Sequence, residues 1–148
     1  MFDANMQEIE TVYFHHLRSS DGAIRHSGDD RSGDTSVDNR DNEVIYINLE
    51  KITARAKFIY IYLNSYKKQD FSSIPYAKVR VIEGKHHDPK QTFATFNLAS
   101  DQAYKGYVSM LMAKLVRMGN RWDFTALGEP IKAKDIDETI AFLQKNTI

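Results

Sequence analysis

The sequence predicts a mainly all-β domain, an antiparallel β-sandwich with one C-terminal α-helix. Short runs of β-branched and aromatic residues recur along the chain between polar or turn residues, which is typical of strands. Near the C-terminus the spacing of apolar residues changes to three or four, which indicates a helix. The length of 148 residues suits one core. We therefore expect one domain over residues 1–148.

Strands are expected on both sides of a polar stretch. The segment "IETVYFHHL" at 9–17 is rich in β-branched and aromatic residues whose side chains would alternate between two faces, which predicts a strand before that stretch. After it come four more runs bounded by polar or turn residues, "VIYINL", "KFIYIYLN", "YAKVRVIEG" and "TFATFNL". They predict strands at 44–49, 57–64, 76–84 and 92–98.

The segment "YVSMLMAKLVRM" at 107–118 is apolar on both alternating faces, which indicates a strand buried on both sides. A helix also fits part of this spacing. We favour a central strand because Gly119 and Asn120 offer a tight turn into another alternating run, "RWDFTAL" at 121–127. At the end of the chain, Asp135 with Glu138 predicts a capping box. The helix is expected from about Asp135 to about Asn146.

The polar stretch at 19–43 predicts a long loop, and loops of this length tend to be functional or disordered. Residues 27–43, called the acidic segment below, contain six carboxylates and two arginines, which is a net charge of about −4. Its carboxylates are Asp29, Asp30, Asp34, Asp38, Asp41 and Glu43. Clustered carboxylates with glycines and neutral oxygen donors suit Ca²⁺, and a merely solvated loop is the alternative. The spacing does not match an EF-hand.

Composition excludes several functions. The chain has no cysteine, so disulfides, thiolate metal sites and cysteine nucleophiles are absent. Lys and Arg number 20 and Asp and Glu also number 20, so no net field attracts nucleic acid. No apolar run is long enough for a transmembrane segment, and the N-terminus lacks the layout of a secretory signal. We expect a cytoplasmic protein without a nucleic-acid partner.

The histidines and the aromatic residues suggest two other kinds of site. Histidines 15, 16, 26, 86 and 87 suggest zinc or a general base, but His15 and His16 would point to opposite faces of the predicted strand. His26 beside Asp29 is the pair that suits acid–base catalysis, so a hydrolase using His26 and neighbouring carboxylates stays an alternative. Aromatic residues such as Trp122 are expected to pack in or over the core, because no basic groove accompanies them.

Several segments together resemble a known family. The segment "DGAIRHSGDDRSGD" running on to "DNEVIYINL" is similar to the aspartate- and glycine-rich signature of the TerD-type tellurium-resistance and stress proteins. Downstream, "FIYIYLNSYKKQDFSSIPYAKVRV", "FNLASD" and "KLVRMGNRWDFTALGEP" follow in the family's order. The resemblance covers residues from about 11 to 130.

The resemblance implies a sandwich of two antiparallel sheets that binds calcium through aspartate-rich loops and takes part in resistance to tellurite and other stresses. It implies no catalytic activity, and partners would be proteins of the same response. It carries over Asp29, Asp30, Asp41 and Glu43 as calcium ligands, with Asp34 and Asp38 less directly matched. A metal-free scaffolding sandwich is the remaining alternative.

One departure concerns the N-terminus. Proteins of this family have additional N-terminal strands that end in a "DLDAS"-like segment, and this chain starts just after it, at "MFDAN". An exposed strand edge is usually covered, and a second copy of the chain is the simplest cover. The resemblance implies that the "DLDAS"-like segment supplies part of the calcium site, so we expect calcium affinity near the weak end of protein calcium sites. We also expect a homodimer.

Overall fold

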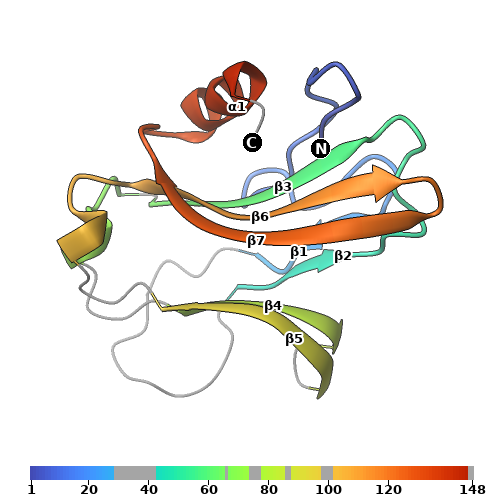
Figure 1. The fold of residues 1–148 in the computed structure, drawn as a ribbon, viewed down its shortest axis with the longest axis horizontal. Helices are drawn as coiled ribbons and strands as arrows, with labels where there is room; N and C mark the ends of the chain where they lie inside the picture. The colour runs from blue at the N-terminus through green and yellow to red at the C-terminus, as the bar shows by residue number, and fades with distance from the viewer. Residues whose placement is uncertain (29–42, 66, 74–77, 86–87, 98–101, 147–148) are drawn as a thin grey trace. The chain divides into compact units, whose positions relative to one another are not determined.

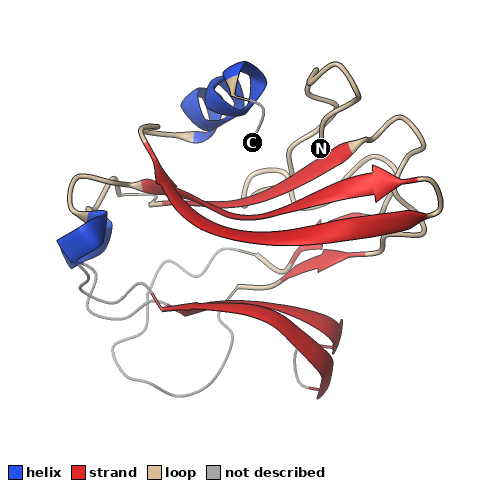
Figure 2. Cartoon of the chain, viewed as in Figure 1, coloured by secondary structure: helices blue, strands red, loops and turns tan. Residues whose placement is uncertain are grey.

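The computed structural model describes residues 1–28, 43–65, 67–73, 78–85, 88–97 and 102–146. It is mainly β structure with one α-helix near the C-terminus (Figures 1 and 2). The strands are β1 Ile24–His26, β2 Ile45–Ile47, β3 Phe58–Asn64, β4 Lys78–Lys85, β5 Asp88–Asn97, β6 Ser109–Met118 and β7 Arg121–Ile131. Two 3₁₀ turns, η1 Phe71–Ser73 and η2 Gln102–Tyr104, precede α1, Ile136–Lys145. The predicted fold class is confirmed.

The strands form three antiparallel sheets. β1 pairs with β2, β4 pairs with β5, and the third sheet has the order β3-β6-β7. The direction of β3 and β6 follows from hydrogen bonds at the two ends of the pair, Arg117 N to Lys57 O at 2.9 Å and Ser65 N to Val108 O at 2.8 Å. The segment at 107–118 is therefore a central strand, as its pattern predicted.

The chain forms two compact units. The first contains Met1–Ile59 with Val116–Trp122, and the second contains Tyr60–Leu115 with Asp123–Ile148. The strands β3, β6 and β7 contribute residues to both. The expectation of a single domain stays a prediction.

The core of the second unit is built on both faces of β6. Met110 and Met112 are buried with Phe71, and Val79 of β4 and Phe96 of β5 pack against them. Leu111 and Ala113 are also fully buried, and successive residues of a strand point to opposite faces. The apolar character of both faces in the sequence therefore reflects real burial on both faces.

A buried polar network connects α1 to this unit. Asn64 Nδ2 donates to Ser109 Oγ at 2.6 Å and to Thr139 Oγ1 at 3.1 Å. Ser109 in turn donates to Ala133 O at 2.8 Å, and Thr139 donates to Asp135 O at 2.8 Å. Ser109 and Thr139 are fully buried, so these bonds replace the water that their hydroxyls lose on folding.

The helix begins where the capping signal placed it. The Asp135 carboxylate accepts a hydrogen bond from Glu138 N at 3.0 Å. The Glu138 carboxylate reaches back to Lys134 N at 2.9 Å, one residue before the cap. With ten residues, α1 is the longest helix among the described ranges, and none there has the length and apolarity to cross a membrane.

The strand predicted at 9–17 is wrong. Tyr13 and His16 exchange backbone hydrogen bonds at 3.1 and 2.9 Å, which closes a tight turn instead. The rings of Tyr13, Phe14 and His15 contact one another, with the Phe14 and His15 centroids 4.2 Å apart. The aromatic residues that suggested a strand form this local cluster instead. Because residues 13–16 form a turn, the argument that His15 and His16 lie on opposite faces of a strand is also wrong.

The loop predicted over 19–43 also needs correction, because β1 lies within it at Ile24–His26. A strand of three residues is too short to show a period, and it is held by pairing with β2 and by the bridge between Arg25 and Arg18. Of the other predicted strands, positions 76, 77 and 98 lie outside the described residues, as do His86 and His87.

Candidate metal site

The strand pair β1–β2 is the stem of the acidic segment. Antiparallel pairing matches Ile24 with Ile47, Arg25 with Tyr46, and His26 with Ile45. One step further out, Ser27 N donates to Val44 O at 2.9 Å and Val44 N donates to Ser27 Oγ at 2.8 Å. The two ends of the acidic segment are therefore held together by two hydrogen bonds.

His26 directly precedes the acidic segment and is 8% exposed. Its Nδ1 accepts a hydrogen bond from Gly28 N at 3.0 Å, so a neutral ring carries its proton on Nε2. Nε2 lies 4.0 Å from Glu43 Oε2, the nearest predicted ligand. Gly28 has φ of +120°, a backbone conformation that favours glycine and lets the chain turn away from the strand.

Of the six predicted ligands, the structure places Glu43. Its carboxylate is exposed at the end of the acidic segment, one residue before the hydrogen-bonded Val44. Asp29, Asp30, Asp34, Asp38 and Asp41 lie outside the described residues. Within the described ranges, no group of three or more His, Asp or Glu side chains could hold a metal ion.

The Asp21 carboxylate accepts hydrogen bonds that hold the chain just before β1 in place. Its Oδ1 accepts from Ser19 Oγ at 2.6 Å and from Ala23 N at 2.9 Å, and its Oδ2 accepts from Thr53 N at 2.8 Å. Burial acts to raise the pKa of Asp21, but the hydrogen bonds from Ser19, Ala23 and Thr53 outweigh it and lower the pKa below its usual value. The sequence showed Asp21 as a turn signal, and its bond to Thr53, 32 residues away, had no local signature.

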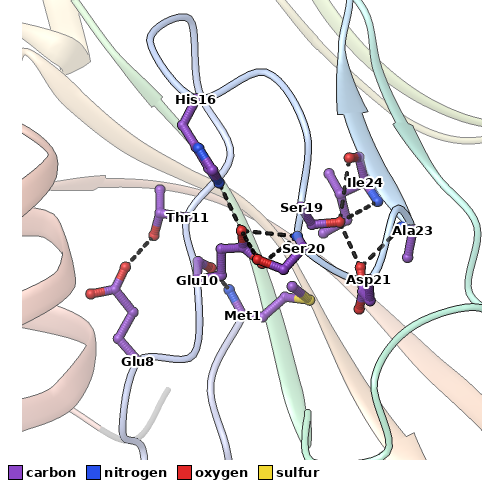
Figure 3. Close-up of polar contacts among 10 residues, drawn as sticks. All are labelled: Met1, Glu8, Glu10, Thr11, His16, Ser19, Ser20, Asp21, Ala23 and Ile24. Carbon is purple, nitrogen blue, oxygen red and sulfur yellow. Dashed lines mark hydrogen bonds and ion pairs between the residues drawn. The ribbon is translucent and has the colours of Figure 1, made fainter.

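A second carboxylate, Glu10, holds the chain that leads into β1 (Figure 3). Glu10 Oε1 lies 2.7 Å from His16 Nε2, and its two oxygens accept from Ser20 N at 3.0 and 2.9 Å. Burial acts to raise the pKa of Glu10, and the bonds from His16 and Ser20 more than offset it, so the pKa is lowered. The carboxylate therefore stays charged and fixes residues 16–20 beside the stem.

The fold and the stem define a class of protein: a mainly β chain that presents a strongly acidic connection from a two-stranded stem. The profile of the TerD domain family matches residues 3–141. The chain belongs to this family.

Among its relatives is "Tellurium resistance protein TerZ" of Serratia marcescens, which is 30% identical over 138 residues, 93% of this chain and 66% of the relative. "Stress response protein SCP2" of Bacillus subtilis (strain 168) is 31% identical over 134 residues, 88% of this chain and 63% of the relative. "Tellurium resistance protein TerD" of Serratia marcescens is 27% identical over 127 residues, covering 82% and 62%. The chain spans just under two thirds of the length of these relatives.

Proposed function

We propose that this chain is a calcium-binding, non-enzymatic module of a stress and tellurium-resistance response, with the acidic segment as its metal site. The observation that supports this proposal is the paired stem β1–β2 at the two ends of the acidic segment. Strands β1 and β2 bring Ser27 and Val44 into mutual hydrogen bonding, and all six carboxylates lie between these two residues in the sequence.

Electrostatics explains why a divalent cation suits this arrangement. Carboxylates clustered in one segment of the chain repel one another, and an ion of charge +2 bound among them removes that repulsion. Ca²⁺ takes roughly six to eight oxygen ligands in a flexible geometry, whereas Mg²⁺ demands a near-ideal octahedron. We therefore expect calcium to bind more tightly than magnesium.

Glu43 fits the role of a ligand that is fixed in advance. It directly precedes Val44, whose backbone is bonded to Ser27, and it lies beside the buried ring of His26. A carboxylate attached to an ordered strand end loses less conformational freedom on binding than one in a free loop. Asp29, Asp30, Asp34, Asp38 and Asp41 are proposed as the remaining carboxylate ligands.

The biological part of the proposal rests on the relatives, whose names include tellurium resistance and stress response. We expect the chain to act in the cytoplasm by presenting a metal-organised surface to protein partners. Chemistry on tellurite is not part of this role. The hydrolase alternative would require His26 as a base, yet its Nδ1 already accepts the Gly28 N–H and its ring is buried.

Isothermal titration of the metal-free protein with CaCl₂ and MgCl₂ tests the site. We expect saturable calcium binding that weakens in Glu43→Gln, with a dissociation constant in the range of about 10⁻⁵ to 10⁻³ M. Glu50→Gln is the matched control, because Glu50 is also exposed and lies outside the acidic segment. An equal loss in both variants would indicate a general charge effect, and no calcium heat in the wild type would refute the proposal.

Self-association is proposed separately. In the third sheet β3 and β7 are the outer strands, and a second copy of the chain that pairs with an outer strand would extend this sheet. Light scattering across a concentration series should show a rise from monomer to dimer mass. A constant monomer mass at high concentration would contradict this expectation.

A further inference from the structure

Two arginines face each other beside β1. Arg18 pairs with Arg25 through an antiparallel bridge. The flanking bonds run from His26 N to Leu17 O at 2.9 Å and from Ser19 N to Ile24 O at 3.0 Å. Bonds in these positions make Arg18 and Arg25 a non-hydrogen-bonded pair, the register in which opposite side chains come closest.

Tyr46 extends this row onto β2. It is the register partner of Arg25, and the Arg25 guanidinium carbon lies 4.7 Å from the centre of its ring. Directly paired residues of an antiparallel sheet share a face, so Arg18, Arg25 and Tyr46 lie side by side on one face. Both arginine side chains are exposed.

This arrangement costs stability when it is empty. Like charges directly opposite each other on a sheet repel. Among the described residues, neither guanidinium has a carboxylate within ion-pair distance. Two adjacent positive charges with no counter-charge among the described residues favour the binding of an anion.

We propose that Arg18 and Arg25 bind a phosphate group. A guanidinium presents a rigid fork of N–H donors, and a phosphate has enough oxygens to receive two forks and enough charge to offset both. A single carboxylate has two oxygens and matches only one fork. The Tyr46 ring already restrains Arg25 through a cation–π contact, which reduces the ordering cost of binding.

Thermal melts in calcium-free buffer test the site with inorganic phosphate as the probe, at constant ionic strength maintained with chloride. The wild type should gain stability from phosphate saturably, with a dissociation constant in the millimolar range. Arg18→Gln should melt slightly higher than the wild type without phosphate, because repulsion is relieved, and should lose at least about tenfold in phosphate affinity.

Two further variants test whether the guanidinium geometry of Arg18 matters beyond its positive charge, and whether any exposed arginine would have the same effect. Arg18→Lys keeps the charge but cannot bind in two-pronged fashion, so its phosphate affinity should also fall. Arg55→Gln removes another exposed arginine of the same unit and should respond to phosphate like the wild type. A phosphoserine peptide in parallel identifies the source: tighter binding through the same arginines indicates phosphate carried on a protein, and equal binding indicates the free ion.

The proposal is overturned if the wild type shows no saturable response, or if Arg18→Gln responds to phosphate as the wild type does. It is also overturned if sulfate and chloride at matched ionic strength reproduce the effect in every variant, because the effect would then be general screening.

Discussion

Replacing Arg117 with methionine should destabilise the first unit strongly. Arg117 Nε donates to Ala56 O at 2.9 Å, and Nη2 donates to Ile52 O at 3.0 Å and to Thr53 O at 3.1 Å. Its guanidinium carbon lies 4.4 Å from the centre of the Trp122 ring. Methionine retains most of the apolar stem but none of the donors.

The magnitude follows from what the substitution leaves behind. Ile52 and Ala56 are 5% and 1% exposed, so their carbonyls cannot easily recover a donor from water. A buried polar group that loses its partner costs about 1–3 kcal/mol, and a lost cation–π contact adds about 0.5–1 kcal/mol. For the two buried carbonyls and the cation–π contact together the total is roughly 2.5–7 kcal/mol, which corresponds to a fall in Tm of roughly 5–28 °C in a chain of this size.

Urea unfolding and thermal melts measure this loss. Arg117→Lys should be intermediate, because an ammonium group keeps the charge but lacks the planar fork that reaches several carbonyls. Arg55→Met is the control, since Arg55 is exposed and its replacement should change stability by no more than about 0.5 kcal/mol. A loss below about 1 kcal/mol in Arg117→Met would refute the reasoning that these carbonyls depend on the guanidinium.

Three further outcomes are expected. Gly128→Ala should cost roughly 2–4 kcal/mol in chemical unfolding, because its φ is +65° and an added Cβ would lie 2.7 Å from Phe96 Cε1. Gly119→Ala is its match, with φ of +66° and nothing within 4 Å, and should cost only about 1–2 kcal/mol; equal losses would exclude the contact. Asp135→Ala should remove about 1 kcal/mol with reduced helical circular dichroism, and an unchanged spectrum and Tm would contradict the cap. Because the folded pKa of Asp21 is lowered from 3.8, its contribution is present above that pH and is lost as pH falls below it. Asp21→Asn should therefore be less stable than the wild type at neutral pH and lose less stability in acid. If both proteins lose the same stability as the pH falls, the argument is contradicted.

Elements with long or double-sided patterns could be predicted from the sequence. The strand β6 was recognised because apolar residues such as Met110 and Leu111 alternate on both faces, and both are buried. The helix was recognised because Asp135 and Glu138 provide a local capping signal that the structure confirms. Both signals are contained in the segments that they describe.

Features that depend on distant partners could not be predicted. Strand β1 exists through pairing with β2, and Asp21 has its role through a bond to Thr53. For residues 9–17 the sequence predicted a strand that the structure does not contain. Their aromatic residues are typical of strands, but here the rings of neighbours such as Phe14 and His15 pack against each other in a turn. For the acidic segment, the sequence supplied the charges, and the structure added the stem that closes it at Ser27 and Val44.

The most direct test of the central proposal compares the melting of the wild type and of Asp29→Asn with Asp30→Asn, each with calcium and with chelator. Calcium at about one hundred times its dissociation constant should stabilise the wild type by roughly 2.7 kcal/mol, or several degrees, and chelator should reverse this. The double variant should gain much less, because two of the proposed ligands have lost their charge. An equal gain in both proteins, or no gain in either, would contradict the assignment of the acidic segment as the calcium site.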